Sequence, residues 1–199
     1  TLKEYWYIPP TSLGEVSKIP ILFINFFNFD LNHLYTFLNM KKKRIIVTGC
    51  CGFIGFSLSK KLLMNKNIEV IGIDTINDYY DVNLKKQRLK LLKNNKNFLF
   101  RKIDIGNFNL LKKVFVNGKI NIVYNFAAQA GVQYSIKNPK KYMISNCVGF
   151  FNILELSRLN GIRNIFYASS SSVYGDSKKF PVKENFELKP KNFYGFSKK

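Results

Sequence analysis

A tyrosine and a lysine four residues apart, Tyr194 and Lys198, form a pair that could carry out acid–base chemistry. Residues at this spacing share one face of a helix, so the phenol and the ammonium group would lie close together. A neighbouring positive charge lowers the pKa of a phenol from about 10, and a phenolate can then act as a base near neutral pH. Tyr174 and Lys178 have the same spacing, but Gly175 lies between them and favours a turn.

Four consecutive serines, Ser169 to Ser172, precede Tyr194 and directly follow an apolar segment that we expect to be a strand. A serine run often forms only a loop. In a parallel sheet, however, ligands bind at the carboxyl ends of the strands. We therefore expect one hydroxyl of this run to lie between Tyr194 and a substrate.

A glycine-rich segment at 48–55 follows the first apolar β-branched run and precedes a segment with helical spacing. Gly49 would allow a tight turn, Gly52 a close approach of the backbone to a pyrophosphate, and Gly55 close packing of helix on strand. The N–H groups and the positive dipole end of the helix would face the phosphates. Asp74 follows at the end of the next expected strand, where a carboxylate can hold both hydroxyls of an adenosine ribose. This context predicts NAD as the cofactor.

The elements that must position these residues alternate regularly after Met40. We expect strands over 44–48, 69–73, 97–103, 120–126 and 163–168, and helices over 53–65, 82–92, 108–116, 142–160 and from about Tyr194. This order predicts an α/β fold, a doubly wound parallel sheet of the Rossmann type. The predicted organisation is an extension of unclear status over 1–39 and an NAD-binding domain over 40–199.

The formal net charge of +20 arises from 27 Lys and 5 Arg against 12 acidic residues. A nucleic-acid or anionic-membrane surface is one reading of such a charge. The lysines are scattered, however, and nucleic-acid sites favour Arg for bidentate contacts. We therefore expect no specific nucleic acid, and keep a non-catalytic basic binding module as the alternative of another class. The apolar stretch 19–38 is interrupted by polar residues, which disfavours a membrane span.

Three cysteines, Cys50, Cys51 and Cys147, are present. Neighbouring cysteines pair only with strain, and the spacing is not that of a metal site. The single His33 cannot complete a zinc site. The sequence therefore predicts no metal and reduced thiols in a cytoplasmic protein.

Four motifs together resemble the extended short-chain dehydrogenase/reductase family in order and spacing. They are TGCCGFIG at 48–55, NFAAQAGV at 125–132, YASSSSVYG at 167–175 and YGFSK at 194–198. The stretch DYYDVNLKKQRL at 78–89 is similar to the UDP-glucuronate 4-epimerase branch of that family.

The resemblance implies a role for each matching position. In the cofactor site, Gly49, Gly52, Phe53, Ile54 and Gly55 would hold the pyrophosphate, and Asp74 the adenosine ribose. Asp104 and Ile105 would flank the adenine, and Ala127, Ala128 and Asn146 would line the nicotinamide side. Lys198 would bind the nicotinamide ribose, and Tyr194 would also contact the cofactor. The resemblance assigns catalysis to Ser170, Tyr194 and Lys198. Ser170, Ser171 and Gln133 would contact the substrate, although Gln133 stands where this branch often has Arg.

The activity implied is epimerisation of a UDP-sugar at C4 through a transient 4-keto intermediate with tightly bound NAD, converting UDP-glucuronate to UDP-galacturonate. UDP-glucose 4-epimerase is the next alternative, followed by a dehydratase or decarboxylase of the same family. Family members continue into a substrate lobe that this chain lacks, so we expect a fragment with little activity alone, and a homodimer for the full-length protein. Because the chain stops as the last helix begins, we also expect Tyr194 and Lys198 to be weakly anchored.

Overall fold

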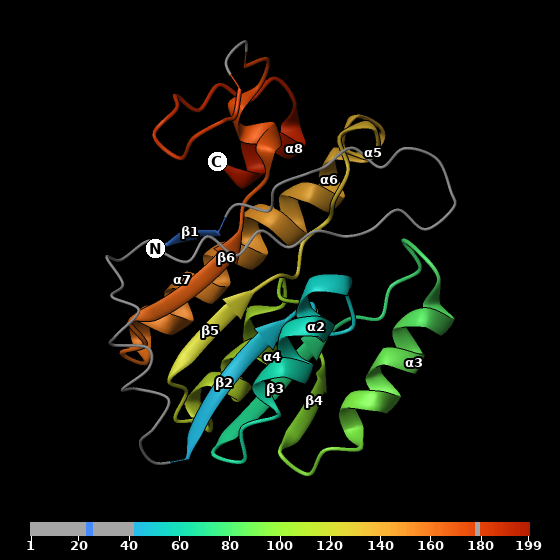
Figure 1. Cartoon of the computed structure of the whole chain (residues 1–199), viewed down its shortest axis with the longest axis vertical. Helices are drawn as coiled ribbons and strands as arrows, with labels where there is room; N and C mark the ends of the chain where they lie inside the picture. Colours follow the sequence, from blue (N-terminus) through green and yellow to red (C-terminus); the bar gives the residue numbers. More distant parts are fainter. Residues whose placement is uncertain (1–22, 26–41, 178–179) are drawn as a thin grey trace.

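A computed structural model describes residues 23–25, 42–177 and 180–199 of the chain (Figure 1). Their strands form one sheet in the order β1-β6-β5-β2-β3-β4. Five strands are parallel: β2 (Lys43–Thr48), β3 (Ile68–Asp74), β4 (Phe98–Lys102), β5 (Ile122–Asn125) and β6 (Asn164–Ala168). At one edge the short strand β1 (Phe23–Asn25) pairs antiparallel with β6.

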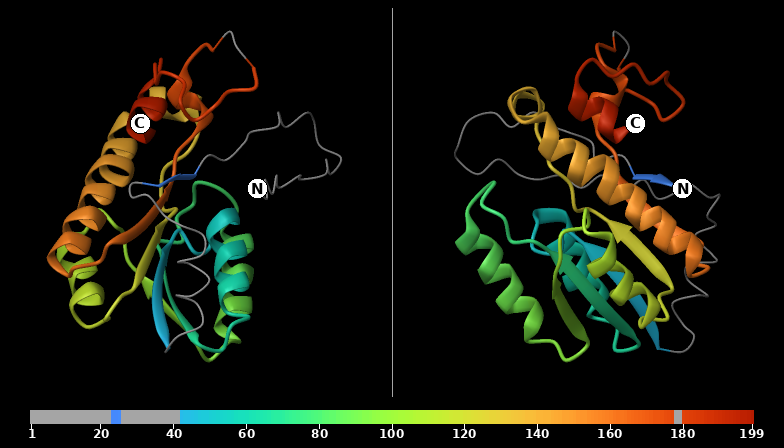
Figure 2. Two further views of the ribbon diagram at one scale, coloured as in Figure 1. Left: turned by 60° about the vertical axis from the view of Figure 1, so that its left-hand side comes forward. Right: turned by 180° about the vertical axis from the view of Figure 1, so that it is seen from behind.

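Helices cover both faces of this sheet (Figure 2). On one face lie α2 (Phe53–Leu62) and α3 (Val82–Lys93). On the other lie α4 (Phe108–Val116) and α7 (Gly149–Leu159), which continues from α6 (Pro139–Tyr142) through a π-helical segment η1 (Met143–Val148). Three short helices stand beyond the carboxyl edge of the sheet: α5 (Val132–Lys137), the 3-10 helix η2 (Ser171–Tyr174) and α8 (Phe193–Lys198).

Alternate residues of the central strand β2 supply a separate core to each face. Ile46 packs with Leu111, Phe115, Ile153 and Leu156 of α4 and α7. Ile45 and Val47 pack in the opposite layer, which α2 and α3 close with residues that include Leu89 and Leu92. Burial on both faces is typical of the central strands of a doubly wound sheet.

The predicted α/β fold is confirmed, and the five expected strands and five expected helices all form. The short helices α5 and η2 were not predicted. Two further features differ from the prediction. The helix expected over 142–160 begins at Pro139, a favoured first helical residue, and passes through the π-helical segment. The edge strand β1 was not predicted, because three residues within 1–39 carry no periodic pattern. The remainder of the 19–38 stretch and His33 lie outside the described residues.

The expectation that Tyr194 and Lys198 are weakly anchored is wrong for this structure. Asn192 caps α8 by accepting a hydrogen bond of 2.8 Å from the Gly195 N–H. A Cβ atom at Gly195 would lie 2.5 Å from the carbonyl oxygen of Ser172, so α8 packs directly on η2. These contacts come from the preceding chain, which is why a helix too short to persist alone is formed here.

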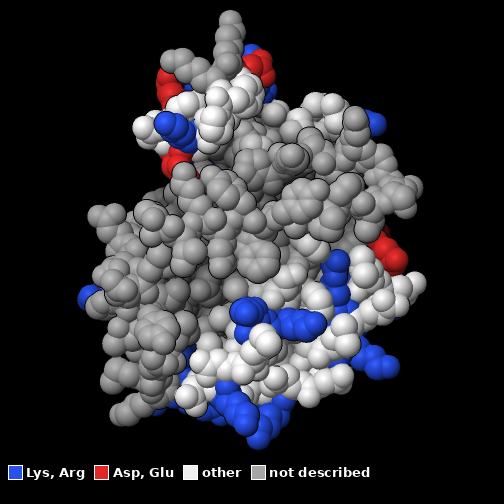
Figure 3. Space-filling view, viewed as in Figure 1, with Lys and Arg blue, Asp and Glu red and all other residues white. Residues whose placement is uncertain are grey.

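Basic side chains are spread over the lower part of the view in Figure 3. Lys42, Lys66 and Lys96 line one surface hollow at the amino ends of β2, β3 and β4, the edge of the sheet opposite η2 and α8. Within the described residues, no helix is long and apolar enough to cross a membrane.

Candidate active site

The order of the strands reverses between β2 and β5, and this is where ligands bind in open parallel sheets. The Thr48 hydroxyl joins the two strand ends at this point. Its Oγ1 donates to Asn125 Oδ1 at 2.6 Å and accepts hydrogen bonds from the backbone N–H groups of Phe126 and Ala127. One buried side chain therefore fixes the spacing between the two walls of the site.

The glycine loop between β2 and α2 has the shape required to receive a pyrophosphate. Gly49 adopts a positive φ of 67°, and a Cβ atom at Gly55 would lie 2.2 Å from the Gly49 carbonyl oxygen. The N-cap of α2 is Gly52, which has no side chain to bond the helix N–H groups, and the first turn carries no acidic residue. This end of the helix therefore fits an anion.

Asp74 lies at the carboxyl end of β3, directly beside the glycine loop. Its Oδ2 accepts a hydrogen bond of 2.9 Å from the Cys51 N–H, and its Oδ1 one of 2.8 Å from the Ile76 N–H. Each carboxylate oxygen can accept a second hydrogen bond, so two neighbouring ribose hydroxyls can still be held. The glycine loop and Asp74 together fit a dinucleotide.

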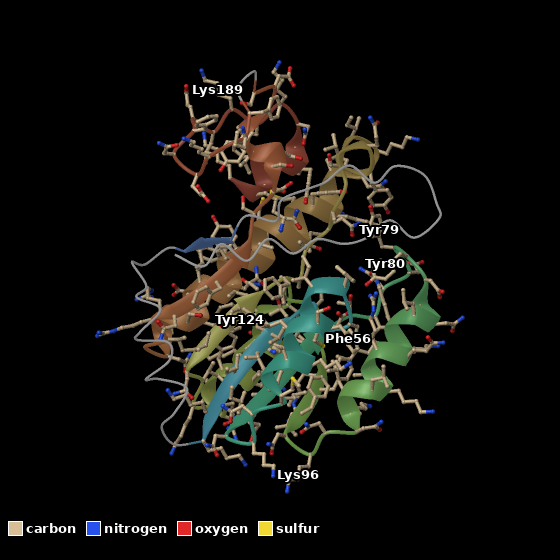
Figure 4. All side chains as sticks on the ribbon, in the orientation of Figure 1. Phe56, Tyr79, Tyr80, Lys96, Tyr124 and Lys189 are labelled. Atoms are coloured by element: carbon tan, nitrogen blue, oxygen red, sulfur yellow. The ribbon has the colours of Figure 1, made fainter. Side chains whose placement is uncertain are left out.

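The loop between β3 and α3 reaches over this region and contacts both of its walls. Tyr79 donates a hydrogen bond of 2.8 Å to the Ala130 carbonyl oxygen in the loop after β5. Tyr80 and Arg88 donate to the Cys51 carbonyl oxygen, at 3.4 and 3.3 Å. Figure 4 shows Tyr79 and Tyr80 together on this loop, above α3. The loop therefore spans the carboxyl edge of β2, where the glycine loop begins.

The predicted catalytic residues meet at the carboxyl end of β6. Ser170 is the N-cap of η2, and Tyr194 and Lys198 lie on α8, which packs against η2. Ser169 Oγ donates to the Lys198 carbonyl oxygen at 2.9 Å, while Lys198 Nζ donates to the Ala168 carbonyl oxygen at 3.1 Å. Two hydrogen bonds thus join the end of β6 to α8, one donated from each side. Tyr174, in contrast, ends η2 at the turn expected there, and Lys178 lies outside the described residues.

Desolvation lowers the pKa of Lys198 to about 8, because the side chain is removed from water at the base of α8. Tyr194 meets the ring of Tyr142 edge to face, with 6.0 Å between ring centroids. Tyr142 is fully buried, and burial raises the pKa of its phenol to about 12. Tyr142 is therefore poorly suited to give up a proton near neutral pH.

Asn146 carries a structural role that sequence reasoning did not find. Its Oδ1 accepts from the Gln129 N–H, and its Nδ2 donates to the Gln129 carbonyl oxygen and to Ser197 Oγ, all within 3.0 Å. Ser197 Oγ in turn donates to the Tyr194 carbonyl oxygen. The π-helical segment that contains Asn146 thus links the loop after β5 to α8. The signal in the sequence for this role was the position of a polar residue, Asn146, within the otherwise largely apolar segment Met143–Val148.

The other predicted positions lie around the same edge. Ala127 and Ala128 follow β5 and are half-buried, while Phe53 and Gln133 are exposed. Ile105 buries its side chain in the core, so only its backbone could flank an adenine. The individual roles of all these residues stay predictions.

The chain is similar in sequence to proteins of one enzyme family. The sequence profile of the GDP-mannose 4,6 dehydratase family matches residues 46–199. Protein CapI of Staphylococcus aureus is 51% identical over 158 residues, which are 78% of this chain and 46% of that protein. The UDP-glucuronate 4-epimerase of Thermodesulfobacterium geofontis is 44% identical over 136 residues, which are 68% of this chain and 42% of the relative.

The solved structures that the chain resembles include epimerases as well. The structure of UDP-glucuronic acid 4-epimerase from Bacillus cereus in complex with UDP-glucuronic acid and NAD matches with a TM-score of 0.72 and 33% identity, over 78% of this chain and 48% of that one. The UDP-Glc/GlcNAc 4-epimerase of Campylobacter jejuni matches with a TM-score of 0.70 and 28% identity, over 78% and 46%. The chain spans about half the length of the relatives that it matches.

Proposed function

Because the chain belongs to the GDP-mannose 4,6 dehydratase family, within the extended short-chain dehydrogenases/reductases, we propose that the whole protein is an NAD-dependent UDP-sugar 4-epimerase acting on UDP-glucuronate. The observation that carries the proposal is the meeting of two half-sites at one edge of the sheet. The glycine loop and Asp74 form the half that fits a dinucleotide, and Ser170, Tyr194 and Lys198 form the other.

In this mechanism Tyr194 accepts the proton of the sugar 4-hydroxyl. Ser170 holds the same oxygen, and the positive charge of Lys198 stabilises the phenolate. NAD held by the glycine loop and Asp74 would supply the acceptor for the C4 hydride. After the 4-keto sugar has turned over in the site, the hydride would return to the opposite face of C4, and Tyr194 gives its proton back to the same 4-oxygen. No net oxidation results, so the reaction needs no second substrate.

The test is turnover of UDP-glucuronate by the purified full-length protein without added NAD. We expect UDP-galacturonate to form until the two epimers reach equilibrium, because a cofactor regenerated in each cycle need not be replaced. UDP-glucose serves as the comparison substrate. Consumption of UDP-glucose with no change in either uronate would show that the substrate assignment is wrong, while C4 epimerisation itself would stand.

A dehydratase or decarboxylase on the same scaffold is the second candidate enzyme. Relatives of that kind commonly carry acidic residues beside the catalytic hydroxyl, whereas Ser171 and Ser172 stand there in this chain. Both serines lie on η2, next to Ser170. Accumulation of a stable 4-keto product or of a pentose would reverse this ranking.

A non-catalytic basic module remains the alternative of another class, supported only by the net charge. The basic hollow formed by Lys42, Lys66 and Lys96 lies opposite the candidate active site. Tight RNA binding that weakens steeply with salt would favour this alternative. We expect weak association without sequence preference.

We also propose a homodimer in the full-length protein. Ile144, Val148, Phe151 and Leu159 are exposed apolar side chains along η1 and α7. Their spacing places them along one side of the helix, which forms the outer layer in Figure 2. A second copy would cover this row. Phe151→Glu should shift the sedimentation coefficient to that of a monomer, and an unchanged dimer would exclude this face.

We also propose a cytoplasmic location for the protein, because free cysteines favour a reducing compartment.

A further inference from the structure

Two neighbouring thiols lie inside the glycine loop, and the proposed epimerase chemistry does not use them. Cys50 and Cys51 are both fully buried, and their sulfur atoms are 3.9 Å apart. Two thiolates on one tetrahedral zinc ion, with Zn–S bonds of about 2.3 Å, have sulfur atoms about 3.8 Å apart. The pair is therefore already close to the spacing needed to hold one ion.

The fold brings a third ligand to this pair. One carboxylate oxygen of Asp74 lies with the two sulfur atoms in a group whose members are all within 4.8 Å of one another. The Cys51 N–H also donates to Asp74 Oδ2, which fixes the carboxylate beside the loop. Two sulfur ligands and one oxygen ligand suit a thiophilic divalent ion such as Zn²⁺ or Cd²⁺.

We propose that Cys50, Cys51 and Asp74 form a binding site for one thiophilic divalent metal ion within the dinucleotide-binding loop. The sequence alone did not indicate it, because Asp74 is 23 positions away from Cys51 and reaches it only across the β2–β3 pair. The ion replaces the two thiol protons, which pass to solvent. No electron is transferred.

Proton release makes this site dependent on pH. Since a metal ligand must be deprotonated, the apparent affinity rises with pH, by ~100-fold per unit where two protons are released.

Metal and dinucleotide should exclude each other, a consequence that rests on the proposed function. The carboxylate that would hold the adenosine ribose would then be a metal ligand, so it could no longer accept the ribose hydroxyls. An excess of a thiophilic metal would therefore block loading of the cofactor without any contact with Tyr194 or Lys198.

The experiment uses Cd²⁺ alone as the probe, added to the purified full-length protein without reductant or dinucleotide. Thiolate-to-cadmium charge-transfer absorption in the ultraviolet reports the number of sulfur ligands. Matched variants are Cys50→Ala, Cys51→Ala and, as the control, Cys147→Ala, which removes the remaining cysteine of this chain from helix η1. We expect one two-sulfur site that is lost in the first two variants and kept in the third.

Circular dichroism establishes that each variant is folded, and Cys50→Ser and Cys51→Ser repeat the test with near-isosteric side chains. Unchanged Cd²⁺ uptake in folded Cys50 and Cys51 variants, or a signal that depends on Cys147, would overturn the site. Binding of NAD is measured separately by calorimetry in the absence of metal. A protein that binds Cd²⁺ at this pair but never binds NAD would refute the proposed function and leave the metal site standing. Simultaneous binding of Cd²⁺ and NAD to one protein molecule would show that the two ligands do not compete.

Discussion

The hydroxyl of Tyr79 donates a hydrogen bond of 2.8 Å to the carbonyl oxygen of Ala130 and so connects the loop after β3 with the loop after β5. These loops flank the glycine loop, which follows β2 between them. A dinucleotide in that loop would lie under this connection. Under the proposed function, this bond would help to retain the cofactor in the glycine loop.

Tyr79→Phe should accelerate release of NAD by about 2- to 10-fold, the equivalent of a hydrogen bond of 0.5–1.5 kcal/mol. The ring would keep its contact with Tyr134, whose centroid is 4.9 Å away. Stopped-flow displacement of bound NAD measures the rate. Tyr134→Phe is the matched control, because the Tyr134 hydroxyl accepts from Lys141 rather than joining the two loops. Equal release rates in wild type and Tyr79→Phe would show that the connection does not retain the cofactor.

Thr48→Val should lower the free energy of unfolding by about 1–3 kcal/mol, because the change leaves buried polar groups without their partner. Asn125 loses its donor, and the N–H groups of Phe126 and Ala127 lose their acceptor. Thr48→Ser, which keeps the hydroxyl, should stay closer to wild type. Urea denaturation of the three proteins measures the difference. If the Thr48→Val and Thr48→Ser proteins are equally stable, these hydrogen bonds do not hold the two strand ends together.

The Lys198 ammonium group should titrate near pH 8 instead of near 10.5. Burial disfavours the charged form, so the folded protein binds fewer protons than the unfolded chain between these values. The free energy of unfolding should therefore rise with pH across this window, and Lys198→Met should remove the rise. Nitrogen-15 NMR of the lysine Nζ follows the titration directly. A midpoint near 10.5 would mean that the side chain is solvated.

Tyr194→Phe should reduce turnover by ~100- to 10,000-fold and leave the cofactor bound, because only the acid–base oxygen is removed. The ring can still pack against Tyr142. Steady-state rates and the NAD content of the purified variant are the two measurements. Activity within a few-fold of wild type would exclude Tyr194 as the base and direct attention to Tyr174.

The sequence predicted the features that are local and repetitive. Strand and helix periods located the sheet, and three glycines followed by Asp74 indicated the edge at which we propose that the cofactor binds. It could not predict Thr48 or Asn146 as connecting residues, because their partners lie far away in the chain. The same limit hid the proximity of Asp74 to the two cysteines. The docking of α8 depends on the close contact of Gly195 with Ser172, which spacing along the chain does not reveal.

The central claim, C4 epimerisation through a 4-keto sugar, is tested most directly with UDP-glucuronate that carries tritium at C4. Hydride leaves C4 and returns to the same carbon in each cycle, so the label should remain at C4 of the UDP-galacturonate formed. No label should enter water, and no reduced cofactor should be released. Loss of the tritium to solvent, or its appearance in a released reduced cofactor, would contradict the account.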